Sequence, residues 1–410
     1  MSNDPRVSVC IPSFNHAPYL PDAIESVLRQ TYRDFEIVLV DDGSTDGSLE
    51  IAARYAESYP SHVRIFTHPG QVNLGISETV NLAYRKSRGE FWSGLPSDDM
   101  LLPDKLERQV DFLDANPNVG WVYSYAELVE QADQPPAELK LLGADITKDD
   151  HPLRHLIQKN SIFGMTAMMR RSCTEKVGLH ETSLIYSDWE FWLRLIAQCQ
   201  VAFLAHPVAR YRVHSYNTSV HVEPHENMRR ALEVMLSFYP KAESLGMAQT
   251  DPRTLALIDL QSCFYFFCLR QEAEATLCMQ SAFQIDPTLA QDEKFFTRWL
   301  RARIFELTYT FPPLSRERGF ASWVRTNLPS AAEKTLADRA AAADMAQAAL
   351  EMRETNLRAS RRLSLSCLRH DPSWLSDGNF RYVLLESLFG QRLMKKLRQL
   401  RLSLEKKVFR

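Results

Sequence analysis

Apolar and polar positions follow two alternating patterns along the first half of the chain. Short apolar runs, such as the one from Val7 to Ile11, predict buried strands, whereas apolar residues three or four apart predict amphipathic helices. The predicted strands cover residues 7–11, 36–40, 63–67, 91–95, 121–130, 162–170, 201–204 and 208–213, and the predicted helices cover residues 20–28, 47–59, 77–86, 103–116 and 188–197. Strands that alternate with helices are typical of a mostly parallel sheet covered by helices on both faces. We therefore predict an α/β fold here, with ligands bound beyond the carboxyl ends of the strands.

The pattern becomes helical in the second half of the chain. Residues 255–287 resemble one tetratricopeptide-like helical pair, and an ordinary helical hairpin also explains a single copy. Residues 331–362 are rich in Ala, Glu and Arg and predict one long helix. The predicted parts are an α/β domain at 1–222, a helical region at 223–312 and a helical extension at 313–410.

The composition is that of an ordinary globular protein. Of 410 residues, 45% are hydrophobic and 24% are charged, and no apolar run approaches the length of a membrane-spanning helix. The first eight residues lack the apolar core of a signal peptide, so we expect a cytoplasmic location. The seven cysteines form no Cys-x-x-Cys pair, and we interpret them as reduced packing residues.

Charge is distributed unevenly around the net value of -3. Residues 331–410 hold 16 Lys and Arg against 9 Asp and Glu, and the remaining residues have a net charge of -10. An acidic body argues against a nucleic-acid partner. The final segment, 392–410, places eight basic residues around a leucine stripe and predicts a basic amphipathic helix. Such a helix can contact an anionic membrane surface, or pack through its stripe on this chain or on a partner.

Two acidic doublets, Asp41-Asp42 and Asp98-Asp99, directly follow predicted strands. Parallel strands end at the same edge of a sheet, so the four carboxylates should converge there, which is costly unless a divalent cation or a hydrogen-bonding ligand compensates them. A metal is the simplest compensation. Oxygen ligands suit Mg2+ or Mn2+, and these ions also bind substrate phosphates. We therefore predict Mn2+ or Mg2+ as the cofactor and a phosphate ester as the substrate. The sequence has no GxxxxGK[ST] loop and no GxGxxG after the first strand, which excludes P-loop and dinucleotide enzymes.

A series of ordered motifs in residues 6–220 closely resembles glycosyltransferase family 2. The motifs are Val7–Asn15, Ala23–Asp46, Asn73–Gly75, Ser97–Glu107, Ser187–Arg194 and Tyr211–His214. The resemblance implies a GT-A type fold, which is a Rossmann-like, mostly parallel sheet flanked by helices. In this chain an all-α C-terminal region would follow that fold.

In this family the loop after the first strand and the first acidic doublet hold the nucleotide. The resemblance therefore implies that the nucleotide-binding residues are Pro12, Ser13, Phe14, Asn15, Asp41, Asp42, Asn73 and Ser97. Asp41 would hydrogen-bond the base, and Asp42 would support the loop or the ribose. The Asp-Asp-Gly-Ser sequence also suits a simple turn with a helix cap.

The second doublet resembles the family's Asp-x-Asp metal motif, with Pro96 in place of the first Asp. Asp98 would be the metal ligand, and Asp99 would orient it or contact the donor sugar. The resemblance also brings Arg212 and His214 to the same phosphates. We expect Arg212 to contact the diphosphate and His214 to be a metal ligand, although a structural histidine fits equally.

Asp188 matches the last acid of the family's Glu-Asp motif, where Ser187 replaces the Glu. By resemblance it would be the catalytic base that removes the proton of the acceptor hydroxyl. A helix cap is its other interpretation. Trp189 would contact the acceptor, although a tryptophan at this position also suits the core.

The resemblance implies a metal-dependent inverting glycosyltransferase of the hexosyltransferase type. Its expected partners are a nucleotide-diphospho-sugar, with a UDP-sugar favoured, and a glycan or lipid-linked acceptor in bacterial surface polysaccharide synthesis. The enzyme would then work in the cytoplasm, at the inner face of the membrane. Two alternatives stay open: a sugar-phosphate nucleotidyltransferase, and a non-catalytic adaptor with a degraded transferase domain.

Overall fold

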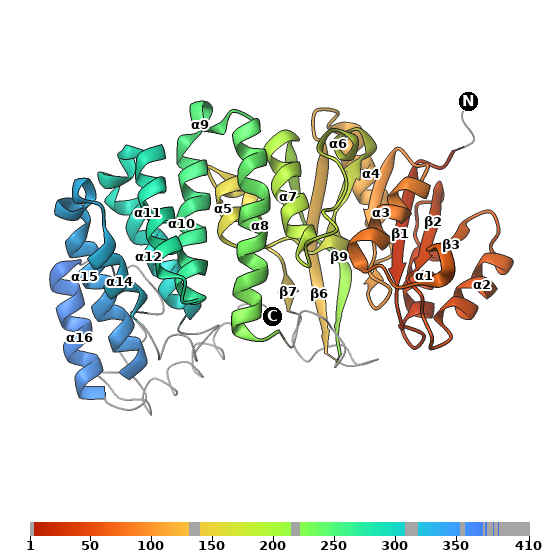
Figure 1. Ribbon diagram of the computed structural model, residues 1–410. Helices are drawn as coiled ribbons and strands as arrows, with labels where there is room; N and C mark the ends of the chain where they lie inside the picture. Colours follow the sequence, from red (N-terminus) through yellow and green to blue (C-terminus); the bar gives the residue numbers. More distant parts are fainter. Residues whose placement is uncertain are drawn as a thin grey trace, which may run out of the picture. The chain divides into compact units, whose positions relative to one another are not determined.

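The computed structural model describes residues 4–130, 140–214, 222–307, 319–352 and 357–371, together with Trp374, Phe380 and Leu384 (Figure 1). It divides into two compact units, Met1–Leu245 and Gly246–Arg410. The predicted basic helix at 392–410 lies outside the described residues.

The first unit contains a sheet and the helices around it. Its strands are β1 (Val7–Ser13), β2 (Phe35–Asp41), β3 (Val63–Thr67), β4 (Phe91–Gly94), β5 (Met100–Leu101), β6 (Trp121–Glu130), β7 (Leu141–Leu142), β8 (Met168–Arg170) and β9 (Val201–Val213). Its helices are α1 (Leu20–Leu28), α2 (Ser48–Ser58), α3 (Ile76–Lys86), α4 (Lys105–Ala115), α5 (Pro152–Gln158), α6 (Arg171–Val177), α7 (Ser187–Gln198) and α8 (Pro224–Ser244).

The strands of the first unit form one sheet in the order β3-β2-β1-β4-β8-β6-β9-β5, with β7 paired to β6. The four strands from β3 to β4 are parallel, whereas β8 is antiparallel to both of its neighbours. The predicted α/β class is confirmed, with a sheet that is mixed beyond β4. The two predicted strands at 201–204 and 208–213 are one strand, β9, with a register irregularity where Tyr125 pairs with Pro207. Proline has no N–H for the ladder, which explains the local irregularity.

β1 is apolar on both sides because both of its faces are covered. Val7, Val9 and Ile11 belong to the core that α1 and α4 complete on one face. On the other face, Cys10 accepts a hydrogen bond from Trp92 Nε1 at 2.7 Å, and the Trp92 ring lies against Tyr84 of α3. The carboxyl ends of β1, β2 and β4 therefore lie at one edge of a sheet that is covered on both faces.

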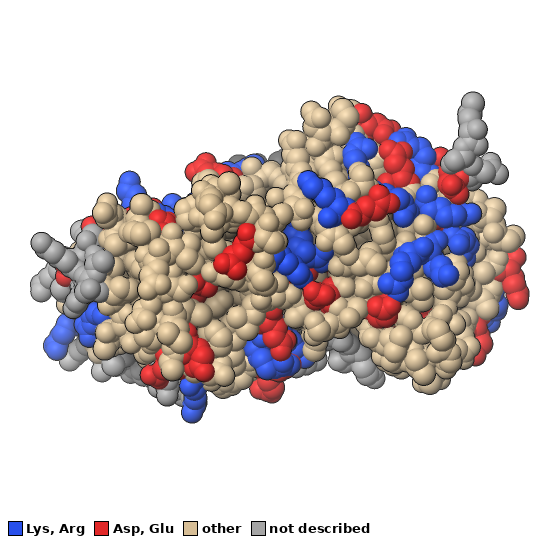
Figure 2. All heavy atoms as spheres, turned by 45° about the horizontal axis from the view of Figure 1, so that its top comes forward, with Lys and Arg blue, Asp and Glu red and all other residues tan. Residues whose placement is uncertain are grey.

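The amino ends of the same strands carry ion pairs. Buried Glu36 accepts from Arg64 at 2.8 Å and from Arg88 at 2.9 Å, and Arg6 contacts both Glu90 and Asp114. Figure 2 shows Lys and Arg side chains beside Asp and Glu side chains over part of this unit. The charges of Glu36 and Arg6 at this edge are therefore compensated by other side chains of the chain.

Lys105 of α4 is fully buried among neutral groups. Its Nζ donates to Ser93 Oγ at 2.7 Å, to Gln109 Oε1 at 2.8 Å and to the Ala167 carbonyl at 3.2 Å. Burial lowers the pKa of Lys105 to about 7. Above that pH the unfolded chain binds a proton at this residue that the folded chain does not, so the free energy of unfolding rises with pH up to the ordinary lysine pKa.

We expect this rise to disappear in Lys105→Met. Between about pH 7.5 and about pH 9.5, the free energy of unfolding of the native chain should gain about 1.4 kcal/mol per pH unit relative to the variant. Urea unfolding at several pH values measures the difference. Lys148→Met is the control, because the Lys148 side chain is 79% exposed and this variant should follow the native pH dependence. If the free energy of unfolding changes with pH in the same way in the native chain and in Lys105→Met, Lys105 is charged in the folded chain.

Helix α8 packs within the first unit, beyond the predicted boundary at residue 222. Tyr186 Oη donates to Asn227 Oδ1 at 2.5 Å, and Lys241 Nζ donates to Glu190 at 2.8 Å, so both ends of α8 contact the region of α7. The division of the remaining chain at residue 312 stays a prediction.

The second unit is helical in its described residues. Its helices are α9 (Met247–Thr250), α10 (Pro252–Cys268), α11 (Glu272–Ile285), α12 (Glu293–Phe305), α14 (Phe320–Asn327), α15 (Ser330–Met352) and α16 (Leu357–His370). The predicted helical pair corresponds to α10 and α11, which pack on each other. The long helix predicted at 331–362 is α15, which ends at Met352 rather than at residue 362. A second helix, α16, packs against α15, with Ser360 Oγ donating to the Ala349 carbonyl at 2.8 Å. Among the described residues, none of the helices combines the length and apolar character needed to cross a membrane.

Candidate active site

The loop after β1 is tied to the loop after β2. Asn15 has a left-handed backbone with φ of 52°, a conformation that Asn tolerates better than most residues. Its Oδ1 accepts from the Thr45 N–H at 2.9 Å, and its N–H donates to Ser44 Oγ at 2.9 Å. Ser13 and Asp41 are paired in the β1–β2 register. The predicted nucleotide loop and the first acidic doublet therefore lie together.

Asp41 has one oxygen engaged and one oxygen unsatisfied. Its Oδ1 accepts from the N–H groups of Gly43 at 3.1 Å and Ser44 at 2.9 Å. Its Oδ2 is buried and has no hydrogen-bond partner among the described residues, and the same holds for Oγ of the neighbouring Ser13. A buried polar atom without a partner costs about 1–3 kcal/mol. These two atoms therefore suit a ligand that supplies the missing partners.

Asp42 holds the loop that precedes α3. Its two carboxylate oxygens accept from the N–H groups of Leu74 at 2.7 Å and Gly75 at 3.0 Å. The Asp42 side chain thus supports this loop, and its backbone N–H donates to the Ser13 carbonyl at the end of β1 at 2.8 Å. Each oxygen of Asp42 already accepts one hydrogen bond, so a ribose hydroxyl would have to donate to a second lone pair on one of these oxygens.

The other predicted nucleotide residues differ in exposure. Pro12 is buried within β1, whereas Phe14 is 43% exposed and Asn73 is exposed. Only the last two present a side chain at the surface, so Pro12 can act only through the backbone.

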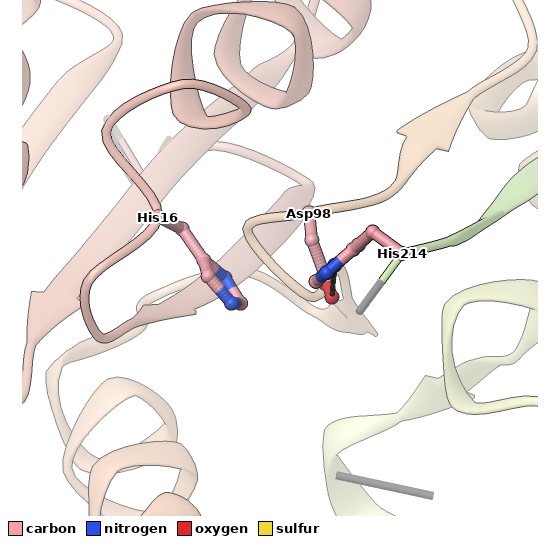
Figure 3. A group of neighbouring side chains, drawn as sticks. All are labelled: His16, Asp98 and His214. Atoms are coloured by element: carbon pink, nitrogen blue, oxygen red, sulfur yellow. Dashed lines mark hydrogen bonds and ion pairs between the residues drawn. The ribbon is translucent and has the colours of Figure 1, made fainter. Parts of the chain in front are cut away.

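The second doublet brings Asp98 to two histidines (Figure 3). His214 Nε2 lies 3.0 Å from Asp98 Oδ2, and His16 Nδ1 lies 2.8 Å from Ser97 Oγ. One potential ligand atom from each of His16, Asp98 and His214 lies within 4.8 Å of the others. The predicted metal residues Asp98 and His214 are therefore in contact, and His16 joins them from the loop after β1.

Asp99 points into the protein rather than toward a ligand. Asp99 as a whole is 1% exposed, and its Oδ1 accepts a hydrogen bond from the backbone N–H of Arg212 at 2.9 Å. Burial, with the neighbouring charge of Asp98, holds the pKa of Asp99 well above its usual range. This position argues against the predicted contact of Asp99 with the donor sugar and favours the orienting role.

Arg212 is stacked beside the metal residues. Its guanidinium lies over the Tyr19 ring at 5.0 Å and pairs with Asp22 at 2.7 Å. His214 also contacts Tyr19, because its ring stacks on the Tyr19 ring with centroids 4.6 Å apart. Arg212 thus supplies positive charge beside His214, and its contact with a diphosphate stays a prediction.

Asp188 lies in the first turn of α7 and is half-buried. Asn160 Nδ2 donates to its Oδ2 at 3.3 Å, and burial raises the pKa of Asp188. Ser77 Oγ donates to Ser187 Oγ at 2.7 Å, which joins the start of α7 to the start of α3. Because Asp42 holds the loop immediately before α3, Asp188 belongs to the same edge of the unit as the first acidic doublet.

Trp189 is 7% exposed, and its Nε1 donates to the Leu156 carbonyl at 2.7 Å. Trp192 is likewise buried, and its ring stacks on Trp121. A covered indole with its N–H engaged fills the core, so this placement argues against the predicted acceptor contact of Trp189.

Three residues near the site were not predicted from the sequence: His16, Tyr19 and Asn160. His16 directly follows Asn15, so its position after the first strand was a usable signal. Tyr19 lies three residues further along the same loop, whereas Asn160 reaches the site only through tertiary packing, for which the sequence carries no local sign.

The unsatisfied Asp41 oxygen and the Asp98–His214 pair follow strands of a Rossmann-like sheet at the carboxyl edge, where open α/β sheets bind their ligands. Residues 8–178 match the model of the family "Glycosyl transferase family 2". The match confirms the predicted resemblance to this family over these residues, and the sheet with its flanking helices confirms the predicted Rossmann-like α/β fold.

Curated relatives are named as glycosyltransferases. An uncharacterised glycosyltransferase of Rickettsia typhi is 31% identical over 223 residues, which cover 52% of this chain and 66% of the relative. One from Haemophilus influenzae is 29% identical over 248 residues, covering 60% of this chain and 93% of the relative. In one from Rickettsia conorii the match covers 36% of the relative. The chain thus spans less than two thirds of the first relatives it matches.

Two solved structures are similar at low identity. TarS 1-349 of S. aureus, in complex with UDP, has a TM-score of 0.46 and 17% identity, covering 94% of this chain and 92% of that chain. The mannosyltransferase PcManGT of Pyrobaculum calidifontis, in complex with GDP-Man and Mn2+, has a TM-score of 0.45 and 19% identity, covering 75% of this chain and 88% of that chain.

Proposed function

We propose that the chain is a metal-dependent inverting glycosyltransferase that moves a sugar from a nucleotide-diphospho-sugar to a hydroxyl of a glycan or lipid-linked acceptor. The observation that carries this proposal is the unsatisfied Asp41 Oδ2 at the carboxyl edge of a family 2 domain. An ionised carboxylate only accepts hydrogen bonds, so it suits a base that presents an N–H. Each of the common nucleobases does so, and the UDP-sugar favoured here rests on the resemblance to glycosyltransferase family 2.

Asp98 and His214 would hold a divalent cation, which supplies neutralisation of the charge on the departing diphosphate when it is bound. The donor set fits such an ion, because a carboxylate and an imidazole are both ligands of Mn2+-like cations and their ligand atoms are 3.0 Å apart. Arg212 adds a fixed positive charge beside His214 through Tyr19.

Asp188 would act as the catalytic base. As the acceptor oxygen attacks the anomeric carbon, its proton moves to the Asp188 carboxylate and the bond from that carbon to the diphosphate breaks. The nucleoside diphosphate leaves with the electron pair, and attack from the opposite side inverts the configuration. The Asn160 amide donates to Oδ2 of Asp188 and so orients the carboxylate for the transfer.

The acceptor side of the proposal includes a membrane surface. The basic segment 392–410 would contact anionic lipid at the inner face of the cell membrane, where a lipid-linked glycan of a bacterial surface polysaccharide is assembled. This part of the proposal rests on the sequence of that segment alone.

A thermal-shift screen of nucleotide-sugars with and without Mn2+ tests the proposal. A donor at about 100 times its Kd should stabilise the native chain by about 2.7 kcal/mol, and Asp41→Asn should reduce this shift. Transfer assays then separate the alternatives: nucleoside diphosphate identifies the glycosyltransferase, whereas pyrophosphate identifies a nucleotidyltransferase. A chain that neither binds nor turns over any donor would be the adaptor.

A further inference from the structure

We propose that His16 is a third protein ligand of the cation, and that the resulting set of two imidazoles and one carboxylate selects Mn2+ over Mg2+. This inference rests on the proposed function, since the cation in question is the one beside the donor diphosphate. It concerns a residue that lies 82 positions before Asp98 in the sequence, in a different loop.

The sequence creates the need for a third ligand. Pro96 stands where the resemblance to the family places the first acid of the metal motif, so Ser97 and Asp98 are left with one carboxylate between them. His16 occupies the space beside that segment, because its Nδ1 lies 2.8 Å from Ser97 Oγ. A neutral imidazole thus lies beside the segment that has lost a carboxylate.

The spacing of Asp98 and His214 suits one ion, and His16 lies close to both. Around a six-coordinate cation with bonds of about 2.1 Å, two ligand atoms are about 3.0 Å apart when adjacent and about 4.2 Å apart when opposite. The Asp98 and His214 atoms are 3.0 Å apart, and the whole set of three lies within 4.8 Å. A small rotation of the His16 ring toward the other two side chains, which meet each other in Figure 3, would complete the set.

Neighbouring groups orient both histidines. The contact of His16 Nδ1 with Ser97 leaves Nε2 as the ligand atom, and such a partner on the second ring nitrogen is typical of metal-binding histidines. The His16 backbone is also fixed, because its N–H donates to Ser48 Oγ at 3.0 Å and its carbonyl accepts from the Tyr19 N–H at 2.9 Å. Tyr19 in turn stacks on His214. The two imidazoles are therefore held by the same short loop.

The ligand set determines which ion is preferred. Mg2+ favours oxygen ligands and keeps several waters, whereas imidazole binds transition-metal ions more strongly. With a second imidazole in place of a carboxylate, the site loses charge that Mg2+ needs and gains nitrogen that Mn2+ accepts. The native chain should therefore bind Mn2+ more tightly than Mg2+.

Binding of Mn2+ to the full chain, measured by electron paramagnetic resonance with and without UDP, tests the inference. Pulsed spectra of the native chain should show coupling to nitrogen from two imidazoles, and His16→Ala should show one. His16→Ala should also weaken Mn2+ binding by about 10–100-fold, the range found when groups that support metal ligands are removed, and change Mg2+ binding less. Circular dichroism checks that the variant is folded. His206→Ala is the control, because the His206 side chain is 42% exposed and pairs only with Asp104 in the described contacts.

Nitrogen coupling from a single imidazole in the native chain, or an unchanged Mn2+ affinity in His16→Ala, would overturn the inference while leaving the proposed transfer reaction intact. Two-imidazole coupling in a chain that transfers no sugar would leave the inference intact and refute the proposed function. Absence of any Mn2+ binding, with and without UDP, would overturn the inference as well.

Discussion

Replacing Asp188 with asparagine should lower kcat for sugar transfer by about 10²–10⁴-fold, the usual contribution of a positioned general base. Asparagine keeps the size of the side chain and its hydrogen bond with Asn160 but cannot take up the acceptor proton. Donor binding should change little, because Asp188 would act on the acceptor rather than on the nucleotide. Release of nucleoside diphosphate under saturating donor measures kcat, and the donor thermal shift measures binding.

The pH dependence of the same reaction gives a second, independent test of Asp188 as the base. Burial raises the pKa of Asp188, so protonation should remove the base at a pH above the ordinary range for aspartate. Native kcat/KM should therefore fall as pH is lowered through that raised pKa, and Asp188→Asn should lack this acidic limb. Asp34→Asn, at an exposed position before β2, is the matched control and should behave like the native chain. A variant Asp188→Asn with native kcat would remove Asp188 from the mechanism.

The sheet could be predicted from the sequence where apolar runs were buried on both faces. β1, β2 and β3 match predicted segments within one or two residues, because each run ends at a polar residue on the carboxyl edge. The strand predicted at 162–170 shortened to β8, since Gly164–Thr166 forms a turn. Apolar residues in an irregular buried segment look the same in sequence as those in a strand, and only the pairing with β4 and β6 distinguishes them.

The two acidic doublets could be located from the sequence, but their separate roles could not. In each doublet one residue faces the site and the other faces the scaffold: Asp41 keeps an unsatisfied oxygen while Asp42 binds backbone N–H groups, and Asp98 meets His214 while Asp99 binds the Arg212 N–H. Asp41 is the last residue of β2 and Asp42 lies just after it, whereas Asp98 lies in a turn in which the Asp99 N–H donates to the Pro96 carbonyl at 3.1 Å. The orientation of each side chain therefore depends on the backbone beyond the strand, which the apolar pattern does not predict.

The acids of α7 divide in a similar way. Glu190 lies two residues after Asp188, is fully buried, and accepts from Arg194 Nε at 2.8 Å and from Lys241 Nζ at 2.8 Å. The Arg194 side chain is only 7% exposed and also donates to the Leu179 carbonyl at 2.7 Å. Asp188 therefore faces the site, whereas Glu190 neutralises a buried guanidinium that joins α7 to the segment after α6.

We expect Glu190→Ala to lower the free energy of unfolding by about 3–5 kcal/mol, because it leaves the Arg194 charge buried without a partner. The loss of Glu190 destabilises Lys241 less, since the Lys241 side chain is 33% exposed and keeps its ion pair with Glu181 at 2.8 Å. Urea unfolding followed by tryptophan fluorescence measures the change. Glu181→Ala is the matched control, because it removes a 44% exposed partner of the same lysine and should cost at most about 1 kcal/mol.

The double variant Glu190→Leu/Arg194→Leu distinguishes the uncompensated charge from simple loss of packing. If the buried charge is the cause, removing both partners should restore most of the stability, since an apolar pair of similar volume replaces a buried ion pair at little cost. Equal destabilisation by Glu190→Ala and Glu181→Ala would contradict this account. If the double variant is destabilised as well, the loss of stability comes from the missing hydrogen bonds that Arg194 donates to backbone carbonyls.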